Sequence, residues 1–189
     1  MSDDATTTAR PRPAPAAGQR PALVVMGVSG SGKTTLGEAV ATHLGLAFVD
    51  GDDLHPPANV AKMAAGIPLD DADRWPWLDR VGGTLADAEA YPAGVVVACS
   101  ALRRVYRDRI RAEAGAGLRF LYLSADEAEM VARLKARPNH YMPPSLVHSQ
   151  FAALEAPDPA GEPDVLTLPA TGAVTEKVDA VARWLDRAP

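Results

Sequence analysis

Residues 27–34, Gly27-Val28-Ser29-Gly30-Ser31-Gly32-Lys33-Thr34, match the phosphate-binding pattern G-x-x-x-x-G-K-[ST] at every fixed position. In this pattern the glycines let successive backbone N–H groups approach phosphate oxygens, the lysine reaches the β- and γ-phosphates, and the threonine hydroxyl holds Mg²⁺. The apolar run 22–26 before it is typical of a buried strand, and residues 33–44 are typical of a helix whose N-terminus faces the phosphates. A Gly/Ser-rich turn that happens to contain a lysine would not require this strand and helix. The sequence therefore predicts a nucleoside triphosphate site formed by residues 27–34 and by Thr35, which follows them.

Length and composition limit the other possibilities. A chain of 189 residues with 47% hydrophobic and 23% charged residues is expected to form one globular domain with a substantial core. The net charge of −5 argues against a large nucleic-acid-binding surface. The single cysteine, Cys99, excludes an internal disulfide framework and suits a reducing compartment. No apolar run approaches the about 20 residues that span a bilayer, and the N-terminus lacks the apolar segment of a secretory signal. We expect a cytoplasmic protein without nucleic-acid or membrane partners.

The order of elements predicts the fold class. Residues 1–21 are rich in proline and lack large apolar side chains, so we expect a disordered tail before a domain that spans 22–189. Unbroken apolar runs predict strands at 22–26, 47–50, 95–99, 119–123 and 165–168. Helical patterns lie at 33–44, 59–65, 71–89, 103–114, 126–136, 144–154 and 175–186. This alternation predicts a three-layer, doubly wound α/β fold with a five-stranded parallel sheet and ligands at the carboxyl ends of its strands.

Polar side chains follow two of these strands. Asp52 and His55 lie in the segment 50–56, where a carboxylate can accept a hydroxyl proton or hold a metal-bound water, and where His55 can contact a polar substrate. The alternative is that Asp52 or Asp53 only caps the next helix, and spacing alone leaves both open. Ser100 ends the third strand and should face the same cleft as Asp52.

Several arginines are candidates for binding anions. Arg74 can grip a carboxylate through two hydrogen bonds, although a residue of this kind is more often an ordinary surface arginine. Arg107 lies near a helix start, where a cation opposes the helix dipole, and this favours a contact with an anionic ligand. Arg133 and Arg137 share one helix face and could neutralise a transferring phosphoryl group, or they could be ordinary cations of a last helical turn.

Further motifs carry a resemblance to a known family. They are Asp50-Gly-Asp-Asp-Leu-His-Pro56, Gly66-Ile-Pro-Leu-Asp-Asp-Ala-Asp-Arg74, Cys99-Ser-Ala-Leu102, and Gln150-Phe151 with Leu154-Glu155. With the phosphate loop, these motifs resemble the gluconokinases, small P-loop sugar kinases related to shikimate kinases and to the nucleoside-monophosphate kinase fold. The resemblance spans about residues 22–186, and the first and third of these motifs are much more specific than the phosphate loop.

The resemblance implies an activity and a set of site residues. It implies ATP-dependent phosphorylation of D-gluconate at its 6-hydroxyl with Mg²⁺, by a homodimer with a mobile lid at about 133–143. By resemblance, catalysis would use Lys33, Asp52 and Arg137, and Mg²⁺ would be held by Thr34 and Asp52. Arg133 would join the phosphate loop in binding the nucleotide. The residues assigned to gluconate are Asp52, His55, Arg74, Ser100, Arg107 and His140.

Two departures and two alternatives accompany this assignment. Arg103 stands where the family pattern leads us to expect a lysine, and the lid contains Pro138, which the resemblance does not predict. A different small-molecule kinase on the same scaffold would act on shikimate, a nucleotide or another sugar acid. A non-enzymatic ATP-dependent switch would have little use for Asp52, His55 and Arg74 together.

Overall fold

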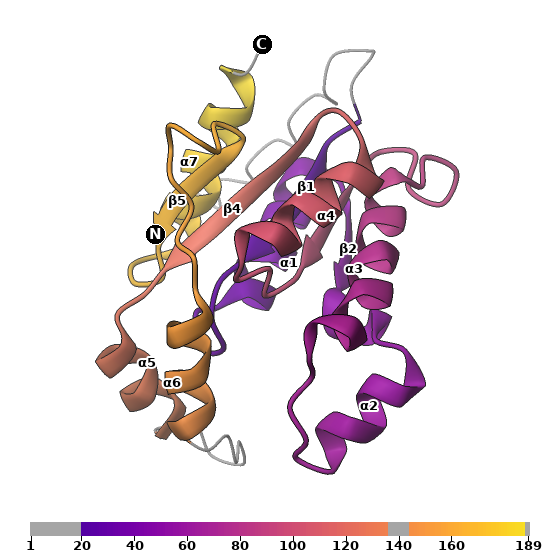
Figure 1. The fold of residues 1–189 in the computed structure, drawn as a ribbon. Helices are drawn as coiled ribbons and strands as arrows, with labels where there is room; N and C mark the ends of the chain where they lie inside the picture. Colours follow the sequence, from indigo (N-terminus) through magenta and orange to yellow (C-terminus); the bar gives the residue numbers. More distant parts are fainter. Residues whose placement is uncertain (1–19, 136–143, 188–189) are drawn as a thin grey trace, which may run out of the picture.

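The computed structural model describes residues 20–135 and 144–187, in which strands and helices alternate (Figure 1). The strands are β1 (Ala22–Met26), β2 (Ala47–Asp50), β3 (Val95–Ala98), β4 (Leu118–Ser124) and β5 (Val165–Pro169). The helices are α1 (Lys33–Leu44), the short 3₁₀ helix η1 (Gly51–Leu54), α2 (Pro57–Ala64), α3 (Asp71–Ala86), α4 (Arg104–Ala114), α5 (Glu127–Lys135), α6 (Pro144–Ala153) and α7 (Val174–Asp186). No helix within the described ranges is long and apolar enough to cross a membrane.

The five strands form one parallel sheet in the order β2-β3-β1-β4-β5, which confirms the predicted fold class. The central strand β1 pairs on both sides, with Val24 opposite Val97 of β3 and Phe120 of β4. Parallel strands whose connections are helices bury both faces of the sheet. This explains why the strand sequences are unbroken apolar runs.

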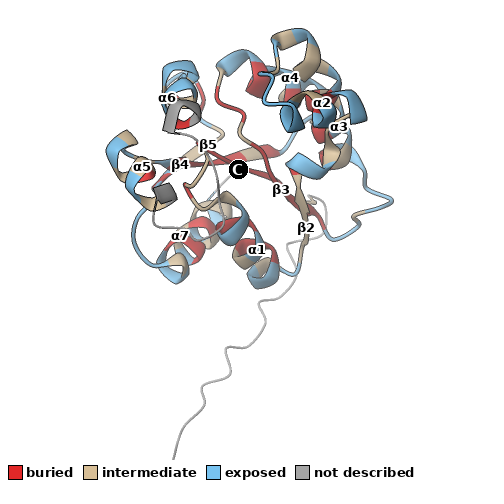
Figure 2. Ribbon diagram, turned by 90° about the horizontal axis from the view of Figure 1, so that it is seen from below, coloured by how far each residue is buried: buried red, intermediate tan, exposed pale blue. Residues whose placement is uncertain are grey.

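Alternate residues of β1 belong to different halves of the core. Leu23 and Val25 pack in the cluster that contains Leu36 of α1 and Val181 of α7. Val24 and Met26 pack in the other cluster, which includes Leu78 of α3 and Ile110 of α4. Figure 2 shows α1 and α7 on one side of the sheet and α3 and α4 on the other, with their buried faces toward the strands.

Gly51 makes the sharp exit from β2 possible. A Cβ atom at this position would collide with the carbonyl oxygen of Ala98 on the neighbouring strand. The close approach turns the chain into η1, so that the side chains after β2 stay at the carboxyl edge of the sheet. Sequence periodicity did not predict this short helix.

Element boundaries agree with the predictions to within a few residues. β1, β2 and α1 match them, and α2 begins at Pro57, a residue suited to a first helical position. The largest difference is α3, which ends at Ala86 rather than at 89. The Asp87 side chain accepts hydrogen bonds from the backbone N–H groups of Glu89 and Ala90, and this turn replaces the expected last helical residues.

The folded domain begins two residues earlier than predicted. Arg20 donates hydrogen bonds to the carbonyls of Leu85, Asp87 and Tyr91 at the end of α3. Val95 of β3 donates its backbone N–H to the Pro21 carbonyl at 3.0 Å. The expectation of a disordered tail therefore does not hold for these two residues, and its remainder, 1–19, lies outside the described residues.

Candidate active site

Three strand ends meet at one edge of the sheet and form the candidate active site. The phosphate loop follows β1, Asp50 ends β2 with Asp52 just after it, and Ser100 follows β3. The backbone N–H of Gly27 donates to the Ser100 carbonyl at 3.3 Å, which joins the first and third of these segments. The structure thus brings together the predicted candidates from three separate parts of the sequence.

The phosphate loop has the shape that anion binding requires. Gly32 caps α1 in the left-handed region with φ of 95°, and the first turn of α1 contains no acidic residue, so the helix N-terminus stays electropositive. The Ser31 hydroxyl is buried without a hydrogen-bond partner among the described residues. A buried polar atom without a partner is costly, and a phosphate oxygen would satisfy it. The loop therefore fits phosphate groups on its own geometry.

Lys33 curls back over this loop. Its Nζ donates to the Val28 carbonyl at 3.1 Å. Burial lowers the pKa of Lys33, while the nearby carboxylates of Asp52 and Asp50 act in the opposite direction. The lysine ammonium thus contacts the loop and feels the charge of both aspartates, and it can act there on a bound phosphate.

Asp50 has a part in the site that sequence reasoning did not assign. The Thr34 hydroxyl donates to Asp50 Oδ2 at 3.3 Å, and the Asp52 backbone N–H donates to Asp50 Oδ1 at 3.1 Å. Asp50, rather than Asp52 or Asp53, therefore caps η1, and the Asp52 side chain remains exposed. A signal was present in the sequence, because Asp50 is the last residue of a predicted strand.

The Thr34 hydroxyl and the Asp50 carboxylate suit a Mg²⁺ ion that is bound partly by phosphates. Within residues 20–135 and 144–187, no three His, Cys, Asp or Glu side chains gather into a possible metal cage. Mg²⁺ commonly keeps several waters and takes only one or two protein ligands together with substrate phosphates. Thr34 and Asp50 provide oxygen atoms of that kind beside the phosphate loop.

His55 is held in one protonation form by its neighbours. Its ring stacks on Trp77 with centroids 4.2 Å apart. Asn59 Nδ2 donates to the Asp73 carbonyl at 2.8 Å and lies 3.3 Å from His55 Nδ1. Because an amide nitrogen only donates, Nδ1 is the acceptor and the hydrogen is on Nε2. Burial lowers the pKa of His55, so the ring is a neutral donor through Nε2.

Arg74 and Arg103 lie against the same tyrosine but differ in their partners. Arg74 Nη1 lies 3.5 Å from the Tyr106 hydroxyl, and its guanidinium carbon lies 5.7 Å from the ring centre. Arg103 donates to both carboxylate oxygens of Asp71, at 3.0 and 2.8 Å. Arg103 Nε also lies 3.6 Å from a carboxylate oxygen of Glu155. Arg103, where we expected a lysine, is thus engaged in ion pairs between α3, α4 and the segment after α6.

The structure contradicts the assignment of Arg107 to the substrate. Its side chain is only 1% exposed and forms an ion pair with Glu162, which is 2% exposed. Arg107 Nη1 donates to the carbonyls of Ala101 and Leu102. Arg107 is therefore not available to a substrate. It supports the backbone that follows Ser100, where Ala101 adopts a positive φ of 41°.

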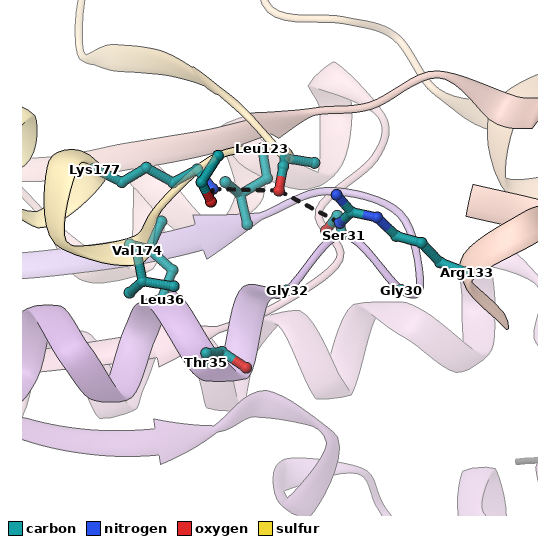
Figure 3. Close-up of a pocket in the computed structure, with 11 residues that line it drawn as sticks. Gly30, Ser31, Gly32, Thr35, Leu36, Leu123, Arg133, Val174 and Lys177 are labelled. Carbon is teal, nitrogen blue, oxygen red and sulfur yellow. Dashed lines mark hydrogen bonds between the residues drawn. The ribbon is translucent and has the colours of Figure 1, made fainter. Parts of the chain in front are cut away.

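A pocket of about 400 Å³ adjoins the phosphate loop (Figure 3). Arg133 and Lys177 both donate to the Ala170 carbonyl, at 3.4 and 3.2 Å, and Lys177 also donates to the Gly172 carbonyl. The other lining residues are Gly30, Ser31, Gly32, Thr35, Leu36, Leu123 and Val174. Sequence analysis named Arg133 and the loop but not the segment after β5, because it carries no motif. Arg137 and His140 lie outside the described residues.

Comparison with known proteins identifies the family. The family described as "AAA domain" matches residues 23–157. The chain is 50% identical to a probable gluconokinase of Schizosaccharomyces pombe over 152 residues, which cover 77% of this chain and 78% of that protein. The crystal structure of a gluconokinase from Sinorhizobium meliloti matches with a TM-score of 0.78 at 45% identity, covering 89% of this chain and 93% of that one. A shikimate kinase from Aquifex aeolicus, at 14% identity and a TM-score of 0.53, shares the fold alone. The chain therefore belongs to the gluconokinase family of P-loop kinases.

Proposed function

We propose that this protein transfers the γ-phosphoryl group of ATP to the 6-hydroxyl of D-gluconate, giving 6-phospho-D-gluconate and ADP. The observation that carries the proposal is a complete phosphate loop, with Lys33 folded over it, at the same edge of the sheet as the Asp52 carboxylate, in a chain that shares 50% identity with a probable gluconokinase. Membership of the family implies the use of ATP and of a small-molecule acceptor. The choice of gluconate as the acceptor is supported by the similar proteins, which are gluconokinases.

On the donor side, the chain binds and neutralises phosphates. The backbone N–H groups of residues 30 and 32–35, the Ser31 hydroxyl and Lys33 hold the β- and γ-phosphates. Arg133 and the pocket next to the loop receive the nucleoside, and Arg137 adds positive charge to the transferring group. Mg²⁺, when bound, offsets phosphate charge, and Thr34 with Asp50 would hold it. We thereby shift the carboxylate role at the metal from Asp52 to Asp50.

On the acceptor side, Asp52 orients the gluconate hydroxyl and takes its proton. As the new bond from this oxygen to the γ-phosphorus forms, the bond to the ADP oxygen breaks, and Asp52 later releases the proton to solvent. Phosphoryl transfer of this type depends mainly on positioning and electrostatics. The exposed Asp52 carboxylate and the nearby Lys33 provide both.

Gluconate would be held by side chains from four segments. Arg74 pairs with the gluconate carboxylate, since a guanidinium binds this group through two hydrogen bonds. His55 donates from Nε2 to a hydroxyl, Ser100 exchanges a hydrogen bond with another, and His140 completes the pocket. Homodimer formation and a cytoplasmic location also remain proposals by family resemblance.

A coupled ADP-release assay with Mg²⁺-ATP tests the function. We expect turnover with D-gluconate and none above the no-acceptor rate with shikimate, glucose or AMP. Turnover with one of those acceptors in place of gluconate would support the kinase activity and contradict gluconate as the substrate. ATP binding without any acceptor-dependent turnover would reject the enzyme.

A further inference from the structure

A glutamine on α6 forms two hydrogen bonds with the third residue of the phosphate loop. The Ser29 backbone N–H donates to Gln150 Oε1 at 2.6 Å, and Gln150 Nε2 donates to the Ser29 hydroxyl at 3.0 Å. The two residues are 121 positions apart in the chain. This paired contact is not required by the phosphate-binding pattern, which leaves position 29 open.

The contact fixes the direction of the Ser29 hydroxyl. A backbone N–H can only donate, so the amide oxygen of Gln150 must face it and the amide nitrogen must face the hydroxyl. The hydroxyl oxygen therefore accepts from Gln150, and its own hydrogen points away from that side chain. Ser29 is next to Val28, whose carbonyl accepts a hydrogen bond from the Lys33 ammonium. The Ser29 hydroxyl is therefore in the same part of the loop as the lysine.

The helix that carries Gln150 is itself firmly held. Val147 is 1% exposed, and Phe151 packs against the cluster that also contains Leu36. Just after the helix, a carboxylate oxygen of Glu155 accepts the backbone N–H of Arg104 at 2.7 Å. Gln150 thus projects from a helix that is packed against the core, and such packing is what a positioned side chain needs for support.

We propose that Gln150 is a positioning residue for phosphoryl transfer, which holds the Ser29 hydroxyl as a hydrogen-bond donor to the transferring phosphoryl group. The proposal rests on the proposed kinase function and adds two residues to it. Gln150 satisfies the Ser29 N–H and directs the hydroxyl, and the hydroxyl then stabilises negative charge that develops on the phosphoryl oxygens. A donor oriented in advance costs no reorganisation during the reaction.

The substitution Gln150→Glu separates this role from simple packing. Glutamate has the same shape and still accepts the Ser29 N–H, but its second oxygen accepts rather than donates. The Ser29 hydroxyl must then donate to the introduced carboxylate, which turns its hydrogen away from the phosphate. We expect kcat to fall about 100-fold, the scale for loss of one preorganised donor, and a similar fall for Ser29→Ala. His148→Ala, at a 79% exposed position of the same helix, is the control and should keep wild-type kcat.

The double variant controls for the added negative charge. If the hydroxyl carries the effect, Gln150→Glu added to Ser29→Ala lowers kcat little further, because the two changes remove the same interaction. An equal fall in both backgrounds would show that charge, and not the hydroxyl, is responsible, and would overturn the proposal.

Two readouts need no turnover. Hydrogen exchange at the Ser29 N–H should be slow in the wild type and in Gln150→Glu and fast in Gln150→Ala, whereas the Kd of a non-hydrolysable ATP analogue should change little in Gln150→Ala. Unchanged hydrogen exchange in Gln150→Ala would contradict the hydrogen bond between Gln150 and Ser29. If the Kd of the ATP analogue rose by the same factor by which kcat/KM fell, Gln150 would act only in nucleotide binding. Failure of the wild type to use gluconate would reject the proposed function and not the contact, since both readouts are made without acceptor.

Discussion

Asp52 lies exposed at the start of η1, next to the ammonium of Lys33. Asp52→Asn keeps the shape of the side chain but removes its capacity to take a proton. We expect kcat to fall by about 10²–10⁴, the range typical of a lost general base, while the Kd values of ATP and gluconate change little. Steady-state kinetics with isothermal titration calorimetry measures both. Asp53→Asn, in the same turn, is the matched control, and unchanged turnover in Asp52→Asn would contradict the role.

His55 makes part of the stability depend on pH. Burial lowers its pKa, so the unfolded chain binds this proton at a higher pH than the folded protein does. The free energy of unfolding is therefore highest above the unfolded pKa of His55, about 6.5. It decreases as pH falls from there toward the lowered pKa of the folded protein. Urea unfolding between pH 5 and 7.5 should show this slope in the wild type and a flatter one in His55→Gln. Parallel slopes would contradict the assignment.

Single residues show what sequence reasoning can reach at the site and what it cannot. The places of Lys33 and Thr34 at the phosphate loop were predictable because a motif fixes them, and their tasks stay predictions. The assignment of Arg107 to gluconate was wrong because its partner, Glu162, is 55 residues away and belongs to a segment without any pattern. Asp50 was missed because a residue at the end of a strand shows no periodicity that separates a capping side chain from a catalytic one.

The end of α3 depends on a side chain from outside the helix. Arg20 donates to the carbonyls of Leu85 and Asp87 there and to that of Tyr91 in the turn beyond, and a helix C-terminus otherwise leaves its last carbonyls without intrahelical partners. Arg20→Ala should lower the free energy of unfolding by about 1–2 kcal/mol, given about 1 kcal/mol for a typical hydrogen bond and partial exposure of this site. Denaturant unfolding measures it, with Arg183→Ala at an exposed position of α7 as the control. Equal stability of the two variants would count against this cap.

The helices and strands were more predictable than their junctions. Apolar runs such as 22–26 and 95–98 can only be buried strands in a sheet covered on both faces, so their positions followed from composition. The turn at Asp87 and the helix η1 depend on local contacts, namely a side chain that accepts two backbone N–H groups and a glycine pressed against Ala98. Contacts of this kind depend on the folded surroundings, which periodicity does not describe.

Two layers of the molecule are joined through a buried charge cluster. Glu162, before β5, accepts hydrogen bonds from Arg107 and Arg111 of α4 at 2.6 to 2.8 Å. Glu162→Gln leaves Arg107 without its counter-charge in the interior, which should cost about 3–5 kcal/mol. Denaturant unfolding of the whole chain measures the loss, and Asp108→Asn, at an exposed carboxylate paired with Arg111, is the control. A loss as small as that of the control would contradict a structural role for the buried pair.

The same cluster sets the acid limit of the fold. Burial alone would raise the pKa of Glu162, but the hydrogen bonds from Arg107 and Arg111 outweigh it and lower the pKa to about 2. Its contribution is therefore complete above the unfolded value of about 4.3 and is lost as pH falls toward 2. Acid unfolding of the wild type should be steeper in this range than that of Glu162→Gln.

The strand order has a consequence for how the chain is made on the ribosome. Ala22 is synthesised before its partners in the sheet, Val95 and Leu118, so β1 stays unpaired until β3 has emerged and gains its second neighbour only with β4. Closing such long loops is slow and leaves apolar segments exposed meanwhile. Chaperone contact should concentrate on nascent chains that end before β4.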